Sequence, residues 1–200
     1  MMQSLSGKIM EETRRLPEGV PVCAKELLHL GSRAAVDQAL SRLVRKGGLL
    51  RAGRGIYLRP IETRFGMRAP APEKFVAKFA SLRGQTVASH GAAAANALGL
   101  TTQVPMRTIY LTSGPSCRLK LGEQVIELKH ARPWLLAKPK GQAGEAIRAL
   151  AWLGPERAEQ GLAAIRSRLS KAELTELRAS RGTLPEWLAR KISTALSACA

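Results

Sequence analysis

The stretch from Ala24 to Pro60 constrains the fold of this chain more than any other, because its signals for helix, turn and hairpin follow one another closely. It reads AKELLHLGSRAAVDQALSRLVRKGGLLRAGRGIYLRP. Apolar residues at helical spacing predict a short helix over residues 24–30 and a second helix over residues 33–46. The glycine pair at 47–48 ends the second helix, and two strands then flank a Gly-Arg-Gly turn. This order predicts a winged helix-turn-helix, a module that reads DNA.

The charge of the chain favours a nucleic-acid partner. Lys and Arg number 32 against 15 Asp and Glu, which gives a net charge of +17 and a pI near 10.9. The excess is +7 in residues 1–68, +7 in residues 69–140 and +3 in residues 141–200. A positive field of this kind attracts phosphate backbones and speeds association with them. A solvated surface without a particular function is the alternative interpretation.

The second helix of the predicted module supplies most candidates for DNA contact. Its N-terminal part is expected to enter the major groove, where Arg pairs with guanine and Gln with adenine. Arg33 and Gln38 are therefore the predicted base-reading residues. Ser32, Ser41, Arg42 and Arg45 are expected at phosphates. Ala34 lies on the same face and completes the predicted DNA-binding set there.

The hairpin and the segment after it add further basic side chains. Arg54, at the turn, is placed to reach a minor groove or a neighbouring phosphate. Residues 63–72 resemble a linker or an extended arm that lies along the phosphate backbone. The DNA-binding candidates in these two segments are Arg51, Arg54, Arg59, Arg64 and Arg68. Ordinary exposed charge is the alternative for each single residue, and docking to a protein is the alternative for the module.

The whole chain predicts an α+β fold with two domains. Residues 1–68 form the winged helix-turn-helix domain, and residues 69–200 form a mixed α/β C-terminal domain. Within the second domain we expect a small sheet over about residues 85–130 and a helical tail over about residues 142–197.

Several helices carry clear end signals. Ser4 or Ser6 is expected to cap a first helix that ends near Arg15. Capping-box patterns predict helices that begin after Ser170 and after Thr183.

The sequence does not predict a metal centre, a bound cofactor or a membrane location. The first residues lack the features of a secretory signal, and no apolar run has membrane-spanning length, so we expect a cytoplasmic protein. The three cysteines, Cys23, Cys117 and Cys199, are far apart and odd in number, which disfavours a zinc site or a disulfide framework.

The residues offer little for catalysis. Glu127 and Lys129 form an acid-x-Lys pair on a predicted strand, as in some metal-dependent nucleases, but magnesium needs further acids nearby. Ser89 and His90 precede an alanine-rich helix, and capping of that helix is favoured over a catalytic pair. We therefore expect no catalytic residue and no enzymatic activity.

Three segments carry a likeness to a known family: the helix-turn-helix stretch above, SHGAAAANALGLTTQVPMRTIYLTSGPS in the middle, and LPEWLARKI near the end. Through them nearly the whole chain resembles the AbiEi-type antitoxins of type IV toxin–antitoxin, or abortive-infection, systems. The resemblance implies a DNA-binding N-terminal domain that represses its own operon by binding inverted repeats, which suits a dimer or cooperative binding. It also implies a C-terminal domain that counteracts a nucleotidyltransferase toxin.

The alternative function is a stand-alone DNA- or RNA-binding regulator. Its C-terminal domain would sense a ligand, and it would have no toxin partner.

Overall fold

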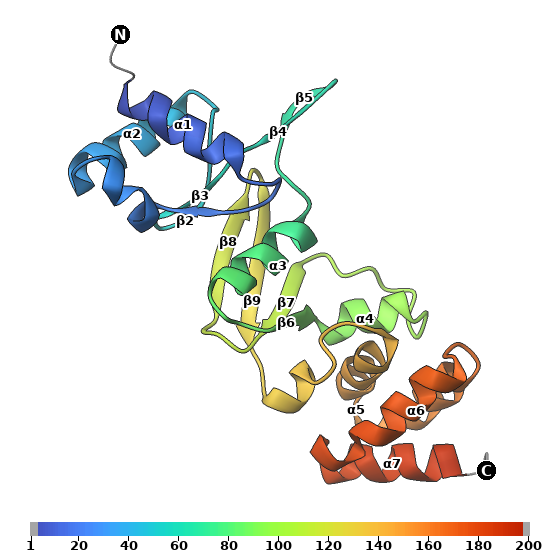
Figure 1. Cartoon of the computed structure of the whole chain (residues 1–200). Coiled ribbons are helices and arrows are strands. Elements are labelled where there is room, and N and C mark those ends of the chain that lie inside the picture. The colour runs from blue at the N-terminus through green and yellow to red at the C-terminus, as the bar shows by residue number, and fades with distance from the viewer. Residues whose placement is uncertain (1–3, 198–200) are drawn as a thin grey trace. The chain divides into compact units, whose positions relative to one another are not determined.

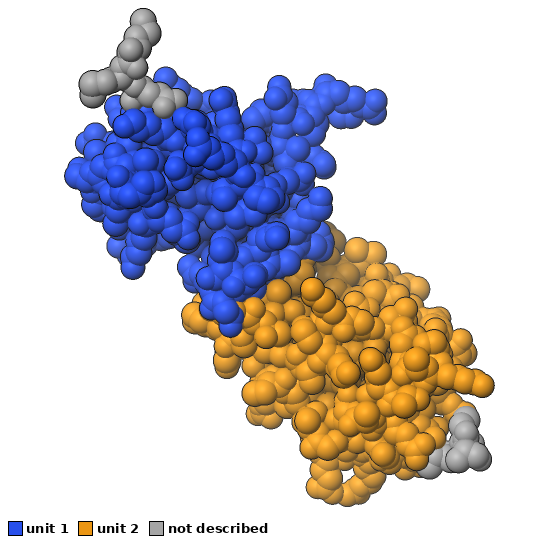
Figure 2. All heavy atoms as spheres, viewed as in Figure 1, with its two compact units in different colours: residues 1–84, 117–126 blue, residues 85–116, 127–200 orange. Residues whose placement is uncertain are grey.

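The fold is α+β, as the sequence predicts, in a computed structural model that describes residues 4–197 (Figure 1). The chain divides into two compact units (Figure 2). Unit 1 contains residues 1–84 and 117–126, and unit 2 contains residues 85–116 and 127–200. Unit 1 therefore takes in residues 69–84 and 117–126 besides the segment in which a winged helix is expected. Cys199 lies outside the described residues.

The first part of unit 1 alternates helices with short strands. Ser4 caps the first helix by accepting a hydrogen bond from the Gly7 amide, as one of the two predicted caps requires. Strand β3 lies in the middle of an antiparallel sheet of order β1-β3-β2. The elements are α1 (Leu5–Arg15), β1 (Val22–Cys23), the 3-10 helix η1 (Ala24–Leu30), α2 (Arg33–Arg45), β2 (Leu50–Gly53) and β3 (Ile56–Leu58).

The helices of this part share one apolar core. Helix α2 contributes Val36, Leu40 and Leu43, which recur at helical spacing and are buried. Ile9 of α1 and Leu27 of η1 pack in the same cluster. The opposite face of α2 consequently remains in solvent.

The segment after β3 differs from the expectation of a linker or arm. Strands β4 (Ile61–Thr63) and β5 (Gly66–Arg68) pair antiparallel and form a hairpin. The hydroxyl of Thr63 stabilises the turn, since it accepts a hydrogen bond from the Phe65 amide and donates one to the Gly66 carbonyl. The prediction missed the hairpin because its strands are short and largely polar, so they lack the apolar alternation of a half-buried strand.

Two later segments complete unit 1. Helix α3 (Pro72–Leu82) buries Phe75 and Phe79, whose rings stack with centroids 5.9 Å apart. Strand β8 (Cys117–Leu121) packs beside β2, and the Leu119 side chain lies over Gly53.

Unit 2 consists mainly of helices with a few strands. Strand β9 (Gln124–His130) begins in unit 1 and ends in unit 2, and the sheet that contains it has the order β6-β7-β9-β8. The other elements are β6 (Val87–Ser89), α4 (Gly91–Ala97), β7 (Thr108–Thr112), η2 (Pro133–Leu136), α5 (Gln142–Arg166), α6 (Lys171–Ala179), η3 (Ser180–Thr183) and α7 (Glu186–Ser197).

Helices α4 and α5 pack very closely at Gly91, because this residue has no side chain to hold the backbone of α5 away. A Cβ atom on Gly91 would lie 2.6 Å from both the Arg148 carbonyl oxygen and the Trp152 Cβ. Helix α5 bends at Gly154, whose φ of 77° is a left-handed value, directly before Pro155. Ser170 and Glu173 form the predicted capping box of α6. Thr183 does not follow its predicted pattern, since it lies in η3 and its hydroxyl donates to the Ser180 carbonyl.

Among residues 4–197, no helix combines the length and the apolar character that a membrane span requires.

Candidate nucleic-acid interface

The candidate interface starts at the N-terminus of α2, which is held in a defined geometry. The Ser32 hydroxyl accepts a hydrogen bond of 3.3 Å from the Ala35 amide and so caps the helix. The sequence predicts a phosphate contact for the Ser32 hydroxyl. In this structure, which contains no DNA, the hydroxyl caps α2. A capped helix N-terminus carries a partial positive charge that attracts anions.

The polar face of α2 is exposed over its whole length. Two arginines near its end, Arg42 and Arg45, have no carboxylate partner among residues 4–197. Part of this face is a shallow depression lined by Asp37, Gln38, Ser41, Arg42 and Arg45. The exposed predicted contact residues on α2 and its cap are Ser32, Arg33, Ala34, Gln38, Ser41, Arg42 and Arg45.

Arg33 differs from Arg42 and Arg45 of the same helix because it forms an ion pair with a carboxylate. Its Nε donates a hydrogen bond of 2.8 Å to Oδ2 of Asp37, one helical turn further on. Both side chains are about half exposed, so the pair is worth little to stability. The carboxylate uses only one edge of the guanidinium, and the remaining N–H groups can still donate to an acceptor on DNA.

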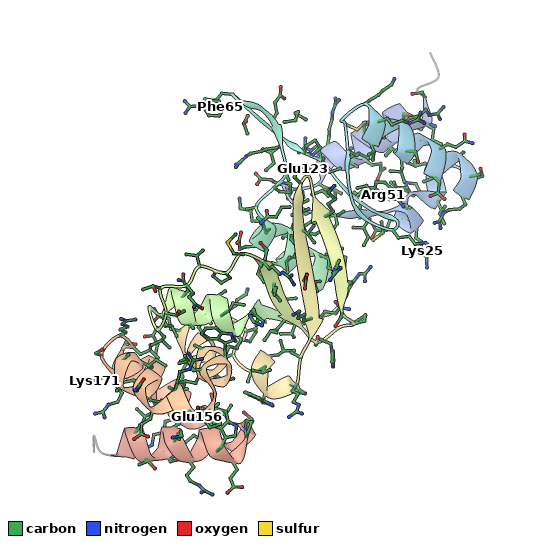
Figure 3. The ribbon with its side chains drawn as sticks, turned by 180° about the vertical axis from the view of Figure 1, so that it is seen from behind. Lys25, Arg51, Phe65, Glu123, Glu156 and Lys171 are labelled. Carbon is green, nitrogen blue, oxygen red and sulfur yellow. The ribbon has the colours of Figure 1, made fainter. Side chains whose placement is uncertain are left out.

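The turn between β2 and β3 adds a second cationic site. Arg54 is exposed beside Gly55, whose φ of 70° favours glycine at this turn. Arg51 is exposed on β2 (Figure 3), and its Nε contacts the Gly53 carbonyl oxygen at 3.4 Å. Both side chains belong to the same unit as α2.

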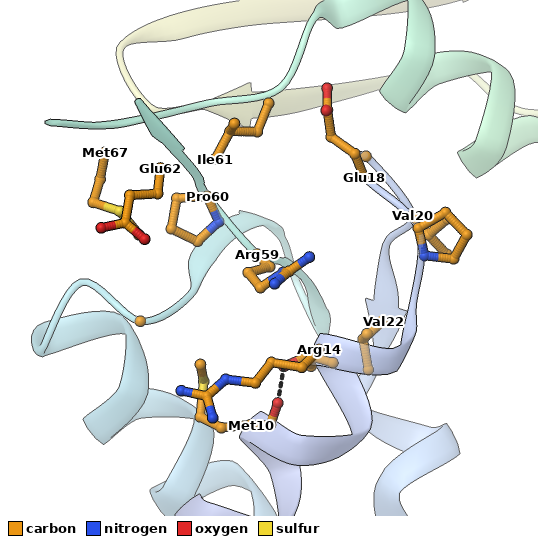
Figure 4. A pocket seen from close by; sticks show the side chains of 14 residues that line it. Met10, Arg14, Glu18, Val20, Val22, Arg59, Pro60, Ile61, Glu62 and Met67 are labelled. Atoms are coloured by element: carbon orange, nitrogen blue, oxygen red, sulfur yellow. Dashed lines mark hydrogen bonds between the residues drawn. The ribbon is translucent and has the colours of Figure 1, made fainter. Parts of the chain in front are cut away.

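Arg59 lies in a different environment from the other predicted residues. It lines a cavity of about 260 Å³ together with Arg14, Glu18 and Glu62 (Figure 4). The cavity therefore contains side chains of both charges. The two nearby carboxylates, on Glu18 and Glu62, make a phosphate contact by Arg59 less favourable than one by Arg42 or Arg45, which have no ion pair among residues 4–197.

The β4–β5 hairpin carries the last two predicted residues, Arg64 and Arg68, and both are exposed. It also presents apolar side chains that the sequence interpretation did not select. Phe65 is 85% exposed and Met67 is 57% exposed. No sequence signal indicated them, because their exposure depends on the β4–β5 hairpin, whose strands are short and largely polar.

Ser89 and His90, which were considered for catalysis, form hydrogen bonds that stabilise the fold of unit 2. The His90 Nδ1 accepts a hydrogen bond from the Ala92 amide and caps α4, as the sequence suggested. Burial, together with the nearby Lys129 ammonium, lowers the pKa of His90. The Ser89 hydroxyl accepts a hydrogen bond of 3.2 Å from Nε of Arg148.

Arg148 is the most buried charged residue of the described chain, at 1% exposure. Its guanidinium also donates to the Lys138 carbonyl oxygen. Burial lowers the pKa of Arg148, which the neighbouring Glu145 partly opposes. The guanidinium thereby connects β6, α5 and the loop before α5.

Glu127 and Lys129 lie on β9, and Glu127 is half-buried while Lys129 is exposed. Within residues 4–197, no group of three or more His, Cys, Asp or Glu side chains is close enough to hold a metal ion.

Comparison with known proteins assigns the chain to a family whose function is unknown. The profile of a family described as "Family of unknown function (DUF6088)" matches residues 8–177. A search of the curated proteins finds no match. Because the matched segment covers most of the sequence, including both compact units, this chain belongs to the DUF6088 family.

Proposed function

We propose that this protein is a sequence-specific DNA-binding repressor of its own operon and the antitoxin of a type IV toxin–antitoxin system. In this proposal residues 1–68 form a winged helix-turn-helix, with α2 as recognition helix and the β2–β3 hairpin as wing. The observation that carries the DNA-binding part is the exposed, capped face of α2, which presents Arg33, Gln38 and Arg42.

The order of elements supports the winged-helix assignment. Helices α1, η1 and α2 precede the hairpin, and β1 joins the hairpin to give the order β1-β3-β2. The recognition helix of such a module inserts its N-terminal residues into the major groove. Among the proposed DNA-contacting arginines within residues 4–197, only Arg33 forms an ion pair, so the others have their charge available for phosphates.

The antitoxin part rests on the resemblance to AbiEi-type proteins. In this proposal the partner is a nucleotidyltransferase toxin, the C-terminal domain of residues 69–200 contributes to its neutralisation, and the protein acts in the cytoplasm without catalysing a reaction. Co-expression with a nucleotidyltransferase from the same operon tests this part. Growth is expected with the full chain and arrest with the toxin alone, and arrest in both cases would contradict it.

A gel-shift titration tests the DNA-binding part. The probe is the duplex upstream of the gene, compared with a scrambled duplex at the same salt concentration. The double variant Arg33→Ala/Gln38→Ala should lose about 1–3 kcal/mol of binding free energy on the upstream duplex for each base contact removed. The matched variant Lys78→Ala/Ser81→Ala, at exposed positions of α3, should bind like the wild type. Equal affinity of both variants for the upstream duplex would contradict the assignment of α2.

A further inference from the structure

The β4–β5 hairpin projects from unit 1, with Phe65 at its far end (Figures 2 and 3). No side chain of residues 61–68 belongs to the buried core. The hairpin therefore adds little to the stability of unit 1 through burial. A two-stranded hairpin of this size is only marginally stable alone, which makes its local contacts important.

Local contacts hold the tip of the hairpin in a defined shape. The Thr63 hydroxyl bonds both the Phe65 amide and the Gly66 carbonyl, the latter at 2.8 Å. Gly66 has a φ of 101°, a value that residues with a side chain rarely adopt. The aromatic ring is thus presented by a turn that is already ordered.

The charge around the ring indicates which partner it meets. The Arg64 guanidinium lies over the Phe65 ring at 4.6 Å from its centroid. Arg68 is exposed on β5, and neither arginine has an ion-pair partner among residues 4–197. An exposed aromatic ring on a hairpin that also carries two arginines without an ion pair is complementary to nucleic acid, which offers flat bases beside phosphates.

We propose that the β4–β5 hairpin enters the minor groove and that Phe65 stacks on a base there, while Arg64 and Arg68 contact the flanking phosphates. This inference rests on the proposed DNA-binding function and adds a second contact site to α2. Architectural proteins use apolar wedges of this kind to open a base step from the minor groove.

Paired footprints on the upstream duplex test this inference. DNase I reports occupancy, and permanganate reports thymines that have lost their stacking. The wild-type protein should give a DNase I footprint with permanganate-reactive thymines inside it or at its edge. Phe65→Ala should keep the DNase I footprint, lose the reactive thymines and bind about 10-fold more weakly. Phe65→Tyr, which retains a flat ring, should preserve them.

The outcomes separate this inference from the proposed function. A DNase I footprint whose permanganate pattern is the same for the wild type and Phe65→Ala would overturn the stacking role and leave DNA binding intact. Loss of toxin binding by Phe65→Ala, with an unchanged permanganate pattern, would also overturn it and assign the ring to a protein partner. The absence of any footprint with the wild-type protein would contradict the proposed function, and the inference with it.

Discussion

At the scale of single residues, the ion pair between Arg33 and Asp37 lies on the face of α2 that we propose to read DNA. Asp37 orients the arginine, but its negative charge also faces the expected position of the phosphates. The substitution Asp37→Asn removes the repulsion between the Asp37 carboxylate and the phosphates, and it also leaves the Arg33 side chain less constrained. We expect affinity for scrambled DNA to rise about 2- to 5-fold, and the ratio of affinities for upstream and scrambled duplexes to fall.

Fluorescence anisotropy with both duplexes measures this ratio. Glu11→Gln is the matched control, because Glu11 forms the same exposed i,i+4 pair with Arg15 on α1. A ratio that is unchanged in Asp37→Asn, or changed equally in the control, would contradict the role of the pair.

His90 gives a pH dependence whose direction follows from its contacts. Its Nδ1 must be unprotonated to accept the Ala92 amide, and burial lowers its pKa in the folded protein. The unfolded chain therefore binds more protons on this residue than the folded chain does. The free energy of unfolding should fall as the pH drops below about 6.5, the ordinary pKa of histidine.

Urea unfolding of the wild type and of His90→Asn between pH 5 and 8 isolates this contribution, since asparagine also caps helices but does not titrate. The difference in unfolding free energy between the two proteins should be constant above pH 7. At lower pH the wild type should lose stability relative to the variant. A pH-independent difference would show that His90 does not titrate in this way.

At the scale of elements, sequence patterns identified most helices and strands. The helices α1 and α2 were predictable because their caps and apolar stripes are local signals. The β4–β5 hairpin was not, since its turn depends on side-chain contacts of Thr63 rather than on apolar alternation. For the candidate site, the polar face of α2 followed from helical periodicity, whereas the exposure of Phe65 depends on a hairpin that the sequence did not indicate.

The packing of α4 against α5 gives a prediction at the same scale. Gly91→Ala would place a methyl group 2.6 Å from the Arg148 carbonyl oxygen, which the helix backbone cannot easily avoid. We expect a loss of about 1–3 kcal/mol in unfolding free energy by urea titration. Gly182→Ala is the control, because nothing lies within 4 Å of its Cβ position. Equal stability of the two variants would contradict the close contact.

At the scale of the whole molecule, unit 1 is assembled from segments that are distant in sequence. Leu119 of β8 lies over Gly53, and the Lys74–Phe75 segment of α3 packs against Gly19. Sequence patterns alone could not show these contacts. Caps and apolar periodicity indicate where an element begins and ends, but not which distant element packs against it. The expected boundary at residue 68 would remove both α3 and β8 from unit 1.

A fragment of residues 1–68 should therefore be less stable than the same segment in the full chain. Hydrogen exchange of the α2 amides measures this directly, and protection is expected to fall by at least about 10-fold, since buried apolar contacts are lost. Equal protection in the fragment and the full chain would show that residues 1–68 are an independent folding unit.

We expect the exposed face of α2 to contact DNA. A photo-crosslinking side chain at Gln38, in the full chain bound to the upstream duplex, reports this contact. The control position is Ala77, which is exposed on α3 of the same unit. Crosslinks to DNA from position 38 and few from position 77 are the predicted result. Bound complexes without a crosslink from position 38 would contradict the claim.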